Sequence, residues 1–119
     1  MEEKYKQNQE NMNYMESIIV AYHKALFVIK NSDKIKETML INEEGSTYHL
    51  SDDNLNGYIN FKDHVDYTIR RLDPFEREFL EKEFFNPGST LWWKNVYSKS
   101  TYYRVKNRTV DKFLRFYHL

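Results

Sequence analysis

Two adjoining helix signals constrain the fold more than any other feature of the sequence. Upstream of the junction, a helix from about 58 to Arg71 is predicted by apolar residues at helical spacing: Phe61, Val65, Ile69 and Leu72. Asp73 is then suited to an N-cap and Pro74 to the first helical position, and Glu76 completes a capping box. The pattern therefore predicts a second helix that starts here and stops at Asn86-Pro87-Gly88.

A longer apolar pattern predicts a helix from about residue 8 to residue 30. Its apolar positions recur at three and four residues: Met15, Ile18, Ile19, Tyr22, Ala25, Leu26 and Ile29. Val20, Phe27 and Val28 widen the apolar surface almost all the way around the helix. Such a helix is either central to its own core or shared with a partner subunit, so a homodimer is one expectation.

Residues 33–57 give the weakest pattern. They fit a short helix followed by a loop, which we prefer, or two brief strands around a turn at Glu44–Gly45. Turn-forming residues at Asn54, Asn56 and Gly57 precede the next apolar pattern. We therefore predict an N-terminal helical segment, 1–57, that serves as a packing or dimerisation arm, and a C-terminal module, 58–119.

Two further helix starts follow in the C-terminal module. Ser89 or Thr90 is suited to cap a short helix through LWWKNVY, and Ser98 is suited to cap a last helix that runs to about Tyr117. Adjacent tryptophans, Trp92 and Trp93, cannot both face water without leaving a large apolar patch. We expect at least one of them to be buried against the last helix, in a fold of the all-α class.

Composition indicates a folded chain with few kinds of reactive site. The chain has 119 residues, the length of one domain, and 40% of them are hydrophobic, which supplies a packed core. It has no cysteine, which excludes disulfides, thiolate metal sites and cysteine nucleophiles and fits a cytoplasmic location. Its polar, acidic start does not resemble a signal peptide, and no apolar run is long enough to span a membrane.

Catalytic and metal-binding patterns are missing from the sequence. The histidines at 23, 49, 64 and 118 include no pair at the spacing that puts two imidazoles on one helical face. The three glycines build no phosphate-binding loop, and no Gly-x-Ser-x-Gly elbow occurs. We therefore expect no enzymatic activity, no metal and no cofactor.

Charge is distributed unevenly along a chain whose formal net charge is zero. Residues 87–119 contain one acid, Asp111, and seven basic residues: Lys94, Lys99, Arg104, Lys106, Arg108, Lys112 and Arg115. This segment therefore carries +6 and residues 1–86 carry −6. A basic end of this kind indicates that the partner is a polyanion or an acidic protein surface.

The helical wheel of the last helix separates an apolar side from a polar side. The residues predicted to face inward are Tyr102, Val105, Thr109, Phe113 and Phe116. The opposite side presents Ser100, Arg104, Asn107 and Arg108, with Lys99 and Tyr103 flanking them. These side chains suit base edges and phosphate oxygens. Two short helices followed by a longer basic helix also form the outline of a helix-turn-helix motif.

Two stretches resemble a known family of DNA-binding domains. LDPFEREFLEKEFF, residues 72–85, looks like the opening helix of sigma-70 region 4 domains. YSKSTYYRVKNRTVDKFLRFY, residues 97–117, is similar to that domain's recognition helix and closer to the Ser-x-Ser-Thr-Tyr-Tyr-Arg-x-Lys run of phage ArpU-type late transcription regulators. The resemblance implies an N-terminal helical arm followed by a sigma region 4-like helix-turn-helix bundle. It also implies a bacterial or phage protein that binds double-stranded DNA and contacts RNA polymerase.

The resemblance also implies residue roles. It places Lys99, Ser100, Tyr103 and Arg104 at base-reading or groove-lining positions, although Val96 stands where such motifs usually have Gly at the turn. Phosphates are expected to be neutralised by Lys94, Lys99, Arg108 and Lys112. The complete predicted DNA-contacting set is Lys94, Ser98, Lys99, Ser100, Tyr103, Arg104, Asn107, Arg108 and Lys112.

Two functions follow from these patterns. The first is a sequence-specific DNA-binding transcription regulator whose recognition helix, about 98–117, enters the major groove. The second is a non-enzymatic protein-interaction module in which the same basic helix docks an acidic surface such as that of RNA polymerase. DNA binding through several phosphates should weaken steeply with salt, whereas a packed protein interface should respond mildly.

Overall fold

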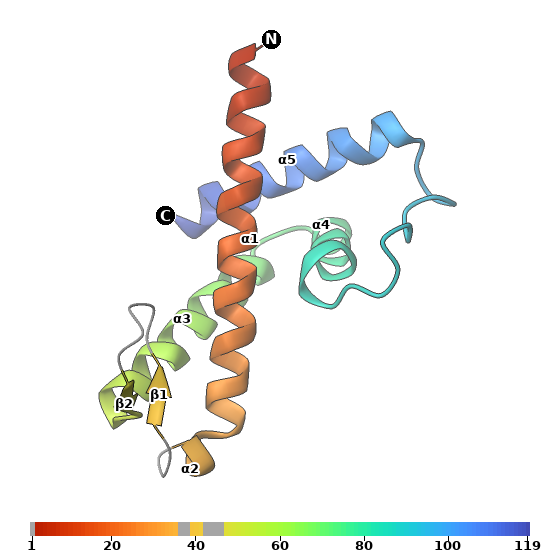
Figure 1. Cartoon of the computed structure of the whole chain (residues 1–119). Helices are drawn as coiled ribbons and strands as arrows, with labels where there is room; N and C mark the ends of the chain where they lie inside the picture. Colours follow the sequence, from red (N-terminus) through yellow and green to blue (C-terminus); the bar gives the residue numbers. More distant parts are fainter. Residues whose placement is uncertain (1, 36–38, 42–46) are drawn as a thin grey trace. The chain divides into compact units, whose positions relative to one another are not determined.

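A computed structural model describes residues 2–35, 39–41 and 47–119 of the chain, with side chains for 2–35 and 50–119 (Figure 1). These residues are predominantly helical, which confirms the all-α class in outline. The elements in chain order are α1 (Glu2–Lys30), α2 (Ser32–Ile35), β1 (Met39–Ile41), β2 (Thr47–His49), α3 (Asp52–Arg70), α4 (Pro74–Leu80), the π-helix η1 (Glu81–Phe85) and α5 (Lys99–Tyr117). None of the helices in this described part is both long enough and apolar enough to cross a membrane.

The chain divides into two compact units. The first comprises Met1–Ile19 and Asp66–Leu119, and the second comprises Val20–Val65. This division differs from the boundary expected at Gly57, because α3 runs through that residue without a break. The predicted start of this helix at residue 58 is wrong, since the hydroxyl of Ser51 accepts a hydrogen bond from the backbone N–H of Asn54 at 3.1 Å and caps an earlier start.

The second unit contains a short antiparallel strand pair in which Met39 lies opposite His49 and Ile41 lies opposite Thr47. The preferred helix followed by a loop is therefore wrong, because the helical part is limited to the four residues of α2. β-branched side chains favour extended backbone, but strands of three residues are too short to show a clear alternation in the sequence. The turn expected at Glu44–Gly45 lies outside the described residues.

A small apolar cluster holds the second unit together. Val28 of α1, Ile35 of α2 and Leu50 are buried against one another, and Leu55 and Tyr58 of α3 pack on this cluster. The cluster explains why a four-residue helix is stable here, since helices this short depend on tertiary packing.

α1 confirms the predicted helix and extends it to Glu2. Its polar first section is supported by amide pairs one turn apart. Gln7 Nε2 donates to Asn11 Oδ1 at 2.9 Å, and Gln9 Nε2 donates to Asn13 Oδ1 at 3.2 Å. These pairs explain why a section without an apolar stripe is still helical.

The apolar surface of α1 is only partly covered. Met15 and Ile18 are buried in the first unit, as their spacing predicts. Val20 and Phe27, which lie seven residues apart on one face, are 71% and 63% exposed. This face of the helix is available to a partner.

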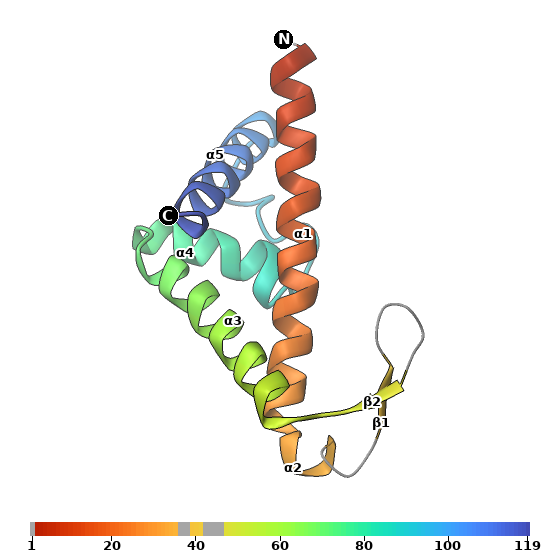
Figure 2. The same cartoon turned by 90° about the vertical axis from the view of Figure 1, so that its left-hand side faces the viewer.

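Two of the helix caps predicted for the first unit, Asp73 and Ser98, are present. The backbone N–H of Asp73 donates to Glu76 Oε1 at 3.0 Å, which completes the capping box at the start of α4. The hydroxyl of Ser98 accepts a hydrogen bond from the backbone N–H of Thr101 at 3.3 Å and starts α5. α4 and α5 then cross and pack together (Figure 2). The most deeply buried apolar side chains of this helix pair are Phe79, Leu80, Val110 and Phe113.

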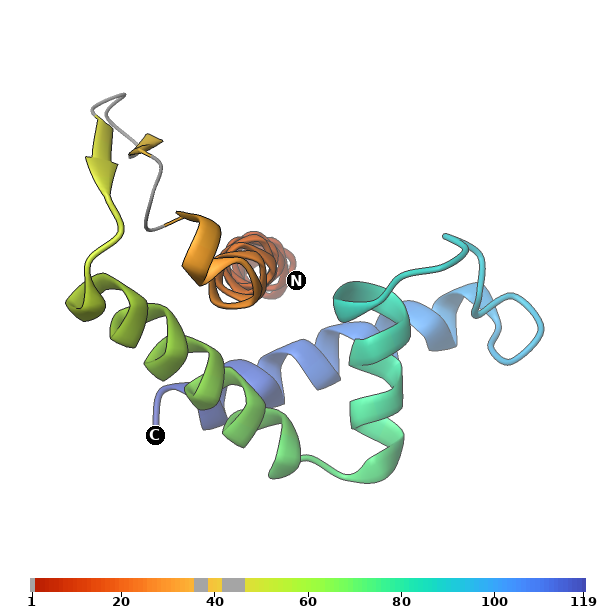
Figure 3. The ribbon, with the colours of Figure 1, turned by 90° about the horizontal axis from the view of Figure 1, so that it is seen from below.

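The connection between η1 and α5 differs from the prediction. Residues 90–96 form successive turns and no α-helix, as Figure 3 also shows. The backbone N–H groups of Lys94 and Val96 donate hydrogen bonds to carbonyl oxygens three residues back, at 3.1 and 2.9 Å. The expected short helix is wrong, because the side chains of Trp92 and Trp93 pack against the neighbouring helices and override its local propensity. A helix-turn-helix arrangement is therefore not confirmed.

Candidate nucleic-acid interface

α5 buries one side in the first unit and exposes the other. The inward residues Tyr102, Val105, Thr109 and Phe113 are all buried, which confirms the predicted wheel, whereas Phe116 is only half-buried. Val110 and Leu114 are buried as well. The buried side is therefore wider than predicted, and the polar side is correspondingly narrower.

The structure divides the predicted DNA-contacting residues by exposure. Asn107 and Lys112 are half-buried. The exposed members are Lys94, Ser98, Lys99, Ser100, Tyr103, Arg104 and Arg108. Ser98 is engaged as the N-cap of α5 and is therefore a structural residue. The others remain available on the surface.

Arg104 and Arg108 form what we call the exposed ridge of α5. They lie one helical turn apart on the side opposite the buried residues. Neither they nor Lys94 and Lys99 make an ion pair with any residue in the described ranges. Their positive charges are therefore not compensated within this part of the molecule.

Lys112 stands in a different environment. Its Nζ lies 2.8 Å from Glu76 Oε1 and 3.6 Å from Asp73 Oδ2, so it joins α5 to the start of α4. The hydrogen bond to Glu76 raises the pKa of the Lys112 ammonium and keeps it charged. Lys112 therefore has a structural role, and its predicted part in neutralising phosphate stays a prediction.

Glu83 of η1 is a residue that sequence reasoning missed. Its carboxylate is only 11% exposed, accepts a hydrogen bond from Trp92 Nε1 at 2.9 Å, and lies 3.1 Å from the Nζ of Lys106. It also accepts a hydrogen bond from the hydroxyl of Tyr102. Burial raises the pKa of Tyr102, and the bond to the carboxylate raises it further. No local pattern marks Glu83, since its partners lie 9 to 23 residues away.

The two tryptophans take part in the same junction. Trp93 stacks on Tyr102 with ring centroids 4.3 Å apart, and Trp92 meets Phe79 edge to face at 5.2 Å. Both indoles are half-buried, so the expectation that one would be largely buried is met only in part. The contact with α5 occurs as predicted, but it comes from a turn and not from a helix.

Tyr14, in the N-terminal half of α1, packs against the C-terminal end of α5 within the first unit, a contact that the sequence did not predict. The rings of Tyr14 and Tyr117 are 6.5 Å apart, and the ring of Tyr14 lies 5.4 Å from that of His118. Met15 of α1 is buried, whereas the side chains of residues 2–7 are all exposed. The two helices therefore separate from this contact outward.

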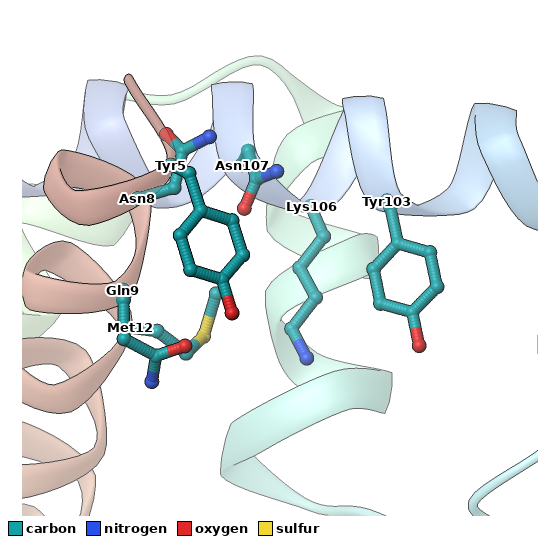
Figure 4. Close-up of a pocket in the computed structure, with 7 residues that line it drawn as sticks. All are labelled: Tyr5, Asn8, Gln9, Met12, Tyr103, Lys106 and Asn107. Carbon is teal, nitrogen blue, oxygen red and sulfur yellow. The ribbon is translucent and has the colours of Figure 1, made fainter. Parts of the chain in front are cut away.

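Two hollows lie where α1 and α5 separate. The first, about 310 Å³, is lined by Tyr5, Asn8, Gln9, Met12, Tyr103, Lys106 and Asn107. Figure 4 shows Lys106 extending between the rings of the two tyrosines, which come from opposite helices. We call this hollow the tyrosine pocket. Because the amino group of Lys106 is held by Glu83, its charge is already compensated.

The second hollow, about 810 Å³, opens on the side of the exposed ridge. We call it the α1–α5 cleft, and its lining residues are Glu3, Lys4, Gln7, Asn8, Asn11, Arg104, Asn107, Arg108 and Asp111. Asp111 is paired with Arg115 at 3.1 Å, so one of the two lining acids is neutralised. Three cationic and four amide side chains of the lining are available to a ligand, and Glu3 is the remaining negative charge.

Searches of protein-family models, of curated proteins and of solved structures each found no match to this chain. The resemblance to sigma-70 region 4 therefore rests on the residues of 72–85 and 97–117.

Proposed function

We propose that the protein is a sequence-specific regulator of transcription that binds double-stranded DNA through the exposed side of α5. The observation that carries this proposal is the exposed ridge. Arg104 and Arg108 project from a helix whose other side is packed, and neither guanidinium is paired with another described residue. Exposed, uncompensated guanidinium groups are the usual donors to guanine edges and phosphate oxygens.

The dimensions of α5 fit this role. An α-helix with its side chains is about 10–12 Å across, and the major groove of B-DNA is about 12 Å wide. The ridge, together with Ser100, occupies the exposed first half of the helix, beyond its contact with Tyr14 of α1. This half can therefore enter the groove with little rearrangement of the packed side.

Selection of bound sites from random duplex DNA tests the proposal. The expected result is enrichment of a defined motif. Affinity for that motif should fall log-linearly with salt, because several phosphate contacts release counterions. Binding to no duplex at any salt concentration would contradict the proposal.

The turns at residues 90–96 favour a second candidate function. In helix-turn-helix domains, the helix before the recognition helix lies across the DNA backbone, and the described part of this chain has no helix there. The basic side of α5 could then dock an acidic protein surface, such as that of RNA polymerase. In that case purified polymerase would bind the protein with a mild salt dependence, and duplex DNA would not.

We also propose a homodimer that is formed through the exposed face of α1. Val20 and Phe27 give this face two large apolar side chains that are available for contact. A two-fold pair would suit two half-sites one helical turn apart. Sedimentation at tens of micromolar should show a dimer that Phe27→Glu disrupts, and a monomeric wild type would contradict this proposal.

A further inference from the structure

The α1–α5 cleft lies in the open angle between the two helices. α1 and α5 meet at Tyr14 and Tyr117 and separate toward their N-termini. In Figures 1 and 2 the first turns of α1 project beyond α5. At a rise of about 1.5 Å per residue, the α1 wall of the cleft, from Glu3 to Asn11, spans about 12 Å. The cleft is therefore long enough to face several groups of an extended ligand.

The α1 wall of the cleft carries one stripe of donors. Lys4, Gln7, Asn8 and Asn11 recur at three and four residues and line the cleft together. The bond from Gln7 to Asn11 holds these two amides in place along the helix. Lysine and amide side chains are common partners of phosphate and sugar oxygens, and such contacts position a protein without reading sequence.

The proposed entry of α5 into DNA determines which ligand can occupy the cleft. A groove about 12 Å wide admits one helix, so α1 cannot enter it beside α5. The cleft between the two helices is then a place where the strand that borders the groove can pass. One strand carries a phosphate charge about every 3.4 Å of helix axis. Lys4 and Arg108 line this path from different helices, α1 and α5.

We infer that the α1–α5 cleft receives the sugar–phosphate strand bordering the major groove, with α1 as a second DNA-contacting element. This inference rests on the proposed function. Lys4, Gln7 and Asn11 hold the strand from the α1 side, and Arg108 holds it from α5. The first turns of α1 thereby fix the register in which α5 meets the bases.

Two lysines on the same helix provide the test. Lys4 lines the cleft, whereas Lys6 is exposed and lines neither hollow. Lys4→Ala should weaken binding to a selected and a scrambled duplex by the same factor, and should reduce the salt slope by about 0.9. Lys6→Ala should leave both the affinity and the slope unchanged. Equal effects of the two substitutions, or none from Lys4→Ala, would overturn the inference.

Cross-linking locates the contact directly. Because the chain has no cysteine, a single cysteine can carry a photoactivated cross-linker without interference. Gln7→Cys, inside the cleft, should cross-link to one strand beside the selected motif, whereas exposed Glu10→Cys should give little product. Equal yields from the two positions would count against the cleft.

Arg104→Ala in the same series separates the two proposals. If this variant relaxes sequence preference while Lys4→Ala and Lys6→Ala behave alike, the inference about the cleft is wrong and the proposed function stands. If the wild type binds no duplex at all, both are overturned.

Discussion

The junction of α5 with α4 and η1 and the exposed ridge of α5 differ in how their basic residues are compensated. At the junction, Lys106 and Lys112 lie 3.1 and 2.8 Å from the carboxylates of Glu83 and Glu76. On the ridge, Arg104 and Arg108 have no such partner among the described residues. The same helix therefore contains cations that hold the fold and cations that are available to a ligand.

This difference shows why the net charge of a segment overstates the number of cations that are available to a ligand. The segment 87–119 carries +6, but two of its cations neutralise acids of α4 and η1. The acids lie 23 and 36 residues before their lysines, so no local pattern reveals the pairs. Only a structure separates the two kinds of cation.

The largest effect is expected at the junction, from Glu83→Ala. This substitution removes the acceptor for Trp92 and Tyr102 and leaves Lys106 without its partner. Removing one partner of a fully buried ion pair costs about 3–5 kcal/mol. Because the side chains of Glu83 and Lys106 are 11% and 19% exposed, the loss here should lie at the lower end of that range. Chemical denaturation should show this loss in the free energy of unfolding.

The matched control is Glu81→Ala, two residues earlier and exposed. It should change the free energy of unfolding by no more than about 0.5 kcal/mol. Similar effects from both glutamates would show that the junction is not organised around Glu83.

The junction should also respond to alkaline pH. The pKa of Tyr102 is raised above the ordinary value of 10.0, chiefly by burial and then by the bond to Glu83. The unfolded phenol therefore loses its proton before the folded one, so the stabilisation is complete below about pH 10 and is lost as the pH rises further. Denaturation midpoints measured from pH 8 to 11 should fall at the alkaline end, and Tyr102→Phe should flatten that fall. An unchanged slope in the variant would assign the fall to other groups.

A smaller effect of opposite sign is expected on the buried side of α5. The hydroxyl of Thr109 is buried and has no hydrogen-bond partner among the residues that the structure describes. Thr109→Val keeps the shape and removes the unpaired polar group, so the free energy of unfolding should rise by about 1 kcal/mol. A loss of stability would show that this hydroxyl has a partner after all, and thermal denaturation distinguishes the two outcomes.

The sequence predicts the fold where local chemistry determines it. The capping residues Asp73 and Ser98 act within their own first turns, so both helix starts could be placed from the sequence. The turns around Trp92 could not, because they depend on contacts with Glu83 and Phe79 that form only in the folded chain. The same reasoning applies to residues 39–49, where strand pairing decides the structure.

The α5 part of the candidate site could be predicted from the sequence. The wheel of α5 identifies Arg104 and Arg108 as exposed because the burial of one face of an amphipathic helix follows from its own sequence. The contribution of α1 was not predictable, because Lys4 and Gln7 line a cleft only when α5 lies beside them. The amide-rich run from Gln7 to Asn13 is the one signal that sequence reasoning could have used.

The central claim is that the ridge binds DNA while the junction holds the fold, and a comparison of Arg104→Ala with Lys112→Ala tests it most directly. Each variant is titrated with a selected and a scrambled duplex and is unfolded with denaturant. Arg104→Ala should lose about 1–3 kcal/mol of discrimination between the duplexes without a change in stability. Lys112→Ala should lower the free energy of unfolding and keep the discrimination. A loss of discrimination in Lys112→Ala with none in Arg104→Ala would contradict the account.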